Sequence, residues 1–61
     1  MKIKIVNRNT GCVLDIKLIH LSYADTKTTD LDYFDEAWRA IVEDGITDDK
    51  YRNKYDFEIV L

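Results

Sequence analysis

Two side chains of this 61-residue chain, Cys12 and His20, are of the types that serve as nucleophile and general base in covalent catalysis. Each type occurs once, and neither residue lies in a catalytic spacing motif. His20 lies near the end of an apolar, strand-like stretch, where a partly exposed histidine is the simplest assignment. Cys12 opens the same stretch and has no second cysteine to pair with. These two residues therefore give no reason to expect an enzyme.

Paired carboxylates are candidates for a metal site, because Asp and Glu oxygens bind Ca²⁺. The pairs in this sequence are Asp30/Asp32, Asp35/Glu36 and Asp48/Asp49. An EF-hand loop needs Gly at its sixth position, and counting from Asp30 puts Asp35 there. Glycine-rich phosphate loops and zinc-type spacings are missing from the sequence as well. We therefore predict no metal site, no cofactor and no catalysis.

Acidic residues are concentrated in the middle of the chain. Residues 25–49 carry nine acids against Lys27 and Arg39, a balance of −7, whereas residues 1–20 have a balance of +3. The whole chain has a net charge of −3. An acidic segment repels nucleic-acid phosphates and anionic membranes and attracts basic protein surfaces. We predict a protein partner, with no direct binding to nucleic acid or membrane.

One amphipathic helix is predicted within residues 30–45, DLDYFDEAWRAIVEDG. At about 100° per residue, one stripe collects the apolar side chains Leu31, Phe34, Ala37, Trp38, Ile41 and Val42. The opposite side carries Asp32, Asp35, Glu36 and Glu43, with Arg39 as its single base. These like charges repel one another and go largely uncompensated within the helix. Thr29 or Asp30 can cap its start, and Gly45 suits the C′ position after its end.

Tyrosines beside these acids complete a candidate contact surface. Tyr33 lies at the margin of the apolar stripe and Tyr51 follows the acids of the next loop, and tyrosines flanked by charge are typical of interface hot spots. The predicted partner-binding residues are Asp32, Tyr33, Asp35, Glu36, Glu43, Asp44, Asp48, Asp49 and Tyr51. The simpler alternative is a solvated helix face that only keeps a tiny protein in solution.

Strand-like patterns flank the helix. Residues 2–6 and 55–61 alternate polar and apolar side chains, as half-buried strands do. Residues 7–11 predict a turn closed by Gly11. Residues 12–23 predict a long second strand that turns Leu14, Ile16 and Leu18 inward, with a bulge near Leu18–Ile19.

Two shorter segments connect these elements. Residues 24–29, ADTKTT, are polar and predict a loop between the second strand and the helix. Residues 47–53 predict a short helical turn, with Thr47 as its cap.

The element order predicts an α+β domain, β-β-α-β, over residues 1–61. Outward Lys2 and Lys4 would face Asp56 and Glu58 across antiparallel neighbours, which favours a three-stranded, mainly antiparallel sheet in the order 2-1-3. The helix packs on one face and leaves the other open. The expected core is Ile3, Ile5, Leu14, Ile16, Leu18, Phe34, Trp38, Ile41, Phe57 and Ile59.

The size and composition of the chain indicate how stable it can be and in which cellular compartment it is expected. A chain of this length buries only about 60% of its unfolded surface, so it folds marginally unless its core is efficient or it oligomerises. Its composition, 46% hydrophobic, is suited to a packed core. A secreted domain this small would normally carry several disulfides, so the single cysteine favours the cytoplasm. No apolar run approaches the roughly 18–20 residues that span a bilayer.

The segment Tyr33-Phe34-Asp35-Glu36 followed by Trp38, on an acidic helix between a hairpin and a last strand, resembles small phage-encoded takeover proteins. The family includes a short, dimeric, DNA-mimicking inhibitor of uracil-DNA glycosylase and a compact inhibitor of bacterial RNA polymerase. The resemblance covers the element order of the whole chain. It implies a non-enzymatic inhibitor in the host cytoplasm, directed at a defence nuclease, DNA-repair enzyme or RNA polymerase with a basic nucleic-acid-binding surface.

A structural or assembly role is the alternative from another class. Exposed strand edges, or a sheet face with Lys2, Lys4, Lys17, Asp56 and Glu58, would then drive homodimerisation or docking into a larger complex. The sequence leaves both hypotheses open.

Overall fold

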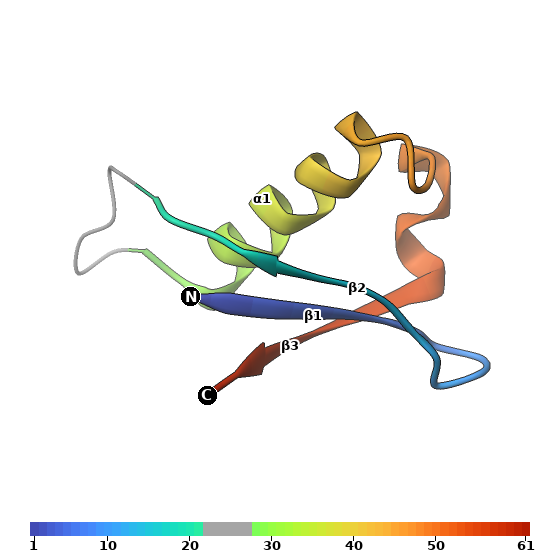
Figure 1. The fold of residues 1–61 in the computed structure, drawn as a ribbon, viewed down its shortest axis with the longest axis horizontal. Coiled ribbons are helices and arrows are strands. Elements are labelled where there is room, and N and C mark those ends of the chain that lie inside the picture. The colour runs from blue at the N-terminus through green and yellow to red at the C-terminus, as the bar shows by residue number, and fades with distance from the viewer. Residues whose placement is uncertain (22–27) are drawn as a thin grey trace.

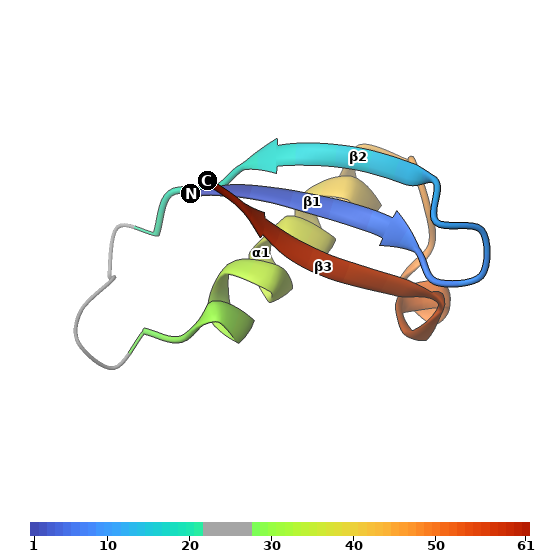
Figure 2. The same ribbon diagram turned by 90° about the horizontal axis from the view of Figure 1, so that it is seen from below.

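The computed structural model describes residues 1–21 and 28–61. The elements along the chain are strands β1 (Lys2–Asn7) and β2 (Val13–Leu18), helix α1 (Asp30–Glu43), 3₁₀ helix η1 (Asp49–Lys54) and strand β3 (Tyr55–Val60). The strands form one antiparallel sheet in the order β2-β1-β3. Helix α1 crosses one face of this sheet, and both termini lie at the same end of it (Figure 1, Figure 2). The predicted fold class, strand order and single covering helix are confirmed.

The turn between β1 and β2 is organised by Asn7. Its side-chain Oδ1 accepts hydrogen bonds from the backbone N–H groups of Asn9 (2.9 Å) and Thr10 (3.1 Å). Gly11 donates its N–H to the Asn7 carbonyl at 2.8 Å and has a φ of 75°, a left-handed value that glycine adopts without steric cost. The predicted turn and the predicted role of Gly11 are confirmed.

The register of β2 differs from the prediction. Ile3 pairs with Lys17 and Ile5 pairs with Asp15, so Asp15 and Lys17 share the helix-covered face with two fully buried isoleucines. The register shifts between Ile5 and Val6, which leaves Leu14 as the extra residue of a β-bulge. The bulge therefore lies four residues before its predicted place, and it reverses the side to which the following residues point.

Ile16 and Leu18 lie on the open face of the sheet as a consequence. They sit opposite Lys4 and Lys2, and their exposed fractions are 48% and 67%. Their predicted inward orientation is wrong. The predicted strand 12–23 is also too long, because β2 ends at Leu18; residues 22–23, and residues 24–27 of the predicted loop, lie outside the described part of the chain.

Helix α1 ends in a Schellman motif. Gly45 has a φ of 76° and donates its N–H to the Val42 carbonyl, and Ile46 donates to the Ile41 carbonyl, each at 3.0 Å. This is the hydrogen-bond pattern expected for glycine at C′, so the predicted stop is confirmed. The motif turns the chain sharply and sends it back toward η1 (Figure 1).

The core lies between α1 and the sheet. Phe57 on β3 stacks on Phe34 at a ring separation of 5.5 Å and meets Trp38 edge-on at 6.2 Å. The buried residues in the described part of the chain are Ile3, Ile5, Ile19, Ala37, Trp38 and Ile41. The half-buried residues packed around them are Leu14, Leu21, Tyr33, Phe34, Val42, Tyr55, Phe57 and Ile59. Leu31, which the helical stripe places inside, is 59% exposed.

The reversed sidedness of β2 can be tested with two isoleucines. Ile5→Val removes a methylene group from a fully buried site and should lower the free energy of unfolding by about 0.5–1.5 kcal/mol. Ile16→Val makes the same change at an exposed site and should stay within about 0.5 kcal/mol of the parent protein. Urea unfolding measures both values. A larger loss for Ile16→Val than for Ile5→Val would contradict the observed register.

Candidate protein-binding surface

A groove runs between α1 and η1 and brings three predicted contact residues together. It has a volume of about 490 Å³ and is lined by Asp35, Trp38, Arg39, Val42, Glu43, Asp49 and Arg52. A smaller depression of about 230 Å³ adjoins it, lined by Asp32, Asp35, Glu36 and Arg39. The predicted acids of α1 thus form one continuous surface with the start of η1. Asp44, Asp48, Tyr33 and Tyr51 do not line either depression.

Two of the α1 carboxylates in this surface have basic partners. Asp35 forms an ion pair with Arg52 of η1, whose guanidinium carbon lies 5.5 Å from the centre of the Phe57 ring. Glu36 pairs with Arg39 one turn along the helix, at 3.3 Å. The expectation that the helix acids go largely uncompensated is wrong for these two residues. Both pairs remain at the surface, with 52% of the Asp35 side chain and 71% of the Arg39 side chain exposed.

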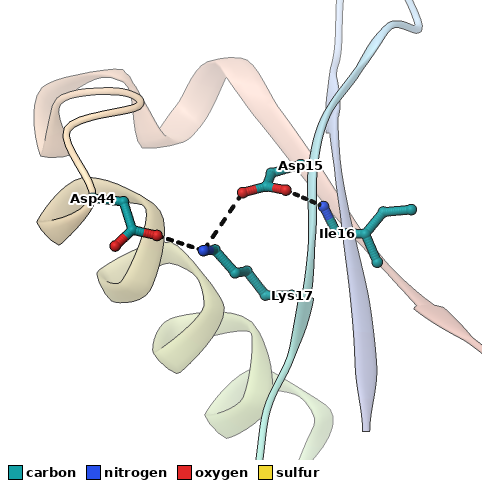
Figure 3. Close-up of polar contacts among 4 residues, drawn as sticks. All are labelled: Asp15, Ile16, Lys17 and Asp44. Carbon is teal, nitrogen blue, oxygen red and sulfur yellow. Dashed lines mark hydrogen bonds and ion pairs between the residues drawn. The ribbon is translucent and has the colours of Figure 1, made fainter.

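Asp44 lies apart from the groove and faces β2 (Figure 3). Its carboxylate binds the Lys17 ammonium, which also lies 3.6 Å from Asp15. The hydrogen bond with Asp44 raises the pKa of Lys17 above 10.5, with smaller contributions from the charges of Asp44 and Asp15. A carboxylate at a helix C-terminus opposes the helix dipole. The Lys17 ammonium supplies the compensating charge from the neighbouring strand.

Asp49 holds the indole of Trp38. Trp38 Nε1 donates to Asp49 Oδ1 at 2.8 Å, and the tryptophan is only 2% exposed. A buried indole N–H without an acceptor is costly, so this carboxylate is part of the packing of the core. It also ties the first residue of η1 to the middle of α1.

Two other predicted contact residues act as caps. Asp32 Oδ2 accepts from the N–H of the N-cap residue Thr29 at 2.8 Å, as one half of a capping box. Asp48 Oδ1 accepts from the Lys50 N–H at 3.2 Å and is the N-cap of η1, so the prediction of Thr47 in that place is wrong. Both aspartates therefore stabilise helix starts as well as adding negative charge.

Glu43 and the two tyrosines complete the set. Glu43 is exposed, and its carboxylate has no ion pair or hydrogen bond within residues 1–21 and 28–61. Tyr51 is exposed on η1, with the ammonium groups of Lys50 and Lys54 at 5.2 and 5.7 Å from its ring centre. Tyr33 is half-buried against the core. Tyr51 is therefore the more accessible of the two tyrosines.

The sequence interpretation missed the basic side chains that approach the acids. Arg52 and Lys17 bind Asp35 and Asp44 across 17 and 27 residues of chain. A signal for Arg52 was present, because Lys50, Arg52 and Lys54 directly follow the acidic segment. With these bases included, residues 28–54 have a balance of −4, which is less negative than residues 25–49 alone.

Catalytic and metal-binding groups do not converge in the described residues. Cys12 and His20 are both exposed and lie beyond opposite ends of β2. The extended chain between these two residues spans roughly 25 Å. Within residues 1–21 and 28–61, no group of three or more His, Cys, Asp and Glu side chains is placed to hold a metal ion. None of the helices described there has the length and apolar character needed to traverse a bilayer.

Comparison with models of protein families, with curated proteins and with solved structures finds no match for this chain.

The indole hydrogen bond predicts a difference between two substitutions of Asp49. Asp49→Ala removes the acceptor and should lower the free energy of unfolding by about 1–3 kcal/mol. Asp49→Asn keeps a side-chain oxygen in reach of Trp38 and should lose less. Urea unfolding followed by Trp38 fluorescence measures both. Equal stability of the alanine variant and the parent protein would show that the hydrogen bond does not matter.

Lys17 predicts a stability change at high pH. Because its pKa is higher in the folded chain than its ordinary value of 10.5, the contribution of Lys17 is fully present below pH 10.5 and is lost as pH rises through the raised value. Asp44→Asn removes the main cause and should lower the Lys17 pKa. Titration of the lysine side-chain signals by NMR measures the shift. Identical Lys17 titration in the parent and Asp44→Asn proteins would exclude Asp44 as the cause.

Proposed function

We propose that this chain is a non-enzymatic binding protein that recognises a basic surface on another protein through the α1–η1 groove and the acidic face of α1. The observation that carries the proposal is the excess of carboxylates on these elements: residues 28–54 hold eight acids against four bases, and all of these acids except Asp44, which faces β2, add to it. A surface with this excess steers a basic partner toward it and orients it during association. The half-buried side chain of Val42 in the lining of the groove adds apolar contact area beside the charges.

The internal ion pairs are compatible with such binding. Pairs exposed to water contribute only about 0–1 kcal/mol, so an arginine or lysine of a partner can replace Arg52 or Arg39 at little cost. Glu43, which has no such pair among the described residues, requires no exchange. Binding through these groups should weaken as salt rises, because the exposed charges are screened.

A more specific proposal concerns the target. The resemblance of the element order and of the Tyr33–Trp38 segment to phage-encoded takeover proteins supports a host nucleic-acid-acting protein as partner, and inhibition as the outcome. The widely separated, single Cys12 and His20 support a non-enzymatic mode of action. The single cysteine, which excludes an internal disulfide, supports the cytoplasm as the compartment.

Two double variants with the same charge change test the acidic surface. Asp35→Asn with Glu43→Gln removes two carboxylates from the groove and leaves both helix caps intact. Asp56→Asn with Glu58→Gln removes two carboxylates from the open face of the sheet, where each also has an exposed ion pair. The groove variant should bind partners captured from host-cell extract at least about tenfold more weakly, and the sheet variant should bind them like the parent protein.

Proteins are first captured from the extract with the parent chain. The affinity of each captured protein for the parent chain, the groove variant and the sheet variant is then measured at low and at moderate salt. A partner that is lost with the groove variant, and lost from the parent chain at higher salt, supports the proposal. Equal affinity of the parent and groove variants for every retained protein would exclude this surface as the binding site.

A further inference from the structure

The two edges of the sheet differ in character. On the open face of β3, Asp56 and Glu58 are charged and form ion pairs with Arg8 (2.9 Å) and Lys4 (3.2 Å). Charged side chains of this kind protect a strand edge from further pairing. The corresponding side chains of β2 are apolar and exposed: Val13 (50%), Ile16 (48%) and Leu18 (67%). Among the described strands, β2 is therefore the edge where a covering partner would remove the most apolar side-chain surface from water.

The outward backbone groups of β2 belong to Ile16 and Leu18. Met1 and Ile19 form a hydrogen-bonded pair: the N-terminal nitrogen donates to the Ile19 carbonyl at 2.8 Å, and the Ile19 N–H donates to the Met1 carbonyl at 2.7 Å. Hydrogen-bonded pairs alternate along an antiparallel ladder, so Lys17 and Asp15 also bond inward to β1. The N–H of Ile16 points outward and donates to the side chain of Asp15 at 2.8 Å (Figure 3).

The charges of β2 are complementary to themselves in one antiparallel register. If two copies pair about Ile16, Asp15 of each copy lies opposite Lys17 of the other. Moving the centre by one residue places Asp15 opposite Asp15 or Lys17 opposite Lys17, which is unfavourable. Pairing about Ile16 also sets the two Ile16 side chains beside each other on the open face and joins the two exposed apolar rows.

We propose that a second copy of this chain pairs with the β2 edge, antiparallel and centred on Ile16, so that two sheets become one. The Ile16 N–H then donates to the Ile16 carbonyl of the second copy. The Asp15 carboxylate, released from that N–H, pairs with Lys17 of the second copy. The Ile16 N–H and the Asp15 carboxylate, which bond to each other in the single chain, therefore each gain a new partner in the dimer. This surface does not include the groove between α1 and η1, so the proposed function does not depend on it.

Sedimentation equilibrium of the full chain tests the pairing over a wide range of protein concentrations. The average mass should rise from 7.2 kDa toward twice that value. Ile16→Lys should raise the dimer dissociation constant at least about tenfold. Leu31→Lys is the matched control, since it makes the same kind of change at an exposed residue of α1, and it should dimerise like the parent chain.

A cross-linking experiment tests the register, with Cys12→Ser in the background. At the centre of an antiparallel hydrogen-bonded pair the two Cα atoms are about 5.5 Å apart, which is within the range of a disulfide. Ile16→Cys should therefore cross-link on mild oxidation much faster than Leu18→Cys. The proposal is overturned by a parent chain that stays monomeric, by an Ile16→Lys variant that dimerises normally, or by faster cross-linking at Leu18.

Discussion

The burial of one indole against a three-stranded sheet is the constraint on which this small fold depends. The Trp38 ring packs against Tyr55 and Phe57 of β3, and its indole N–H donates to Asp49. This hydrogen bond fixes η1 relative to α1, and the chain must reverse at Gly45 to reach that position. Trp38 is the one aromatic residue among the six buried residues of the described chain, and aromatic side chains bury the most apolar area per residue. The groove at the surface of α1 exists because η1 is held beside the helix in this way.

The sequence predicted the elements whose apolar side chains follow a single phase. β1, β3 and α1 each turn their main apolar face toward the core, although Leu31 at the start of the α1 stripe stays exposed. Residues 13–21, which include β2, have apolar side chains in both phases, Leu14-Ile16-Leu18 and Ile19-Leu21, so their pattern does not decide which side of the strand faces the helix. The outcome depends on the bulge at Leu14 and on the ion pairs of Lys17, which form between distant parts of the chain. Because side chains alternate between the two faces of a strand, the one-residue shift at the bulge moved Ile16 and Leu18 from the predicted inner face to the open face.

Local interactions at the candidate surface were more readable from the sequence than distant ones, although the cap of η1 is Asp48 and not Thr47. The pairing of Thr29 with Asp32 and the stop at Gly45 involve neighbours in sequence, and both caps follow from residue type. The pairing of Asp35 with Arg52 depends on the path of the chain after the helix. The acidic face is therefore less negative than the helix sequence alone predicts. The edge position of β2 was predicted with the strand order, but its exposed apolar side chains, Ile16 and Leu18, follow from the same unforeseen register. They give the molecule a second surface, distinct from the groove.

The packing of Trp38 is tested most directly by proton NMR of the parent chain. The indole ring should give nuclear Overhauser effects to the ring protons of both Tyr55 and Phe57, and its Nε1 proton should exchange slowly with water because it is bonded to Asp49. An indole without contacts to these two rings, with an Nε1 proton that exchanges as fast as in a free peptide, would contradict the account.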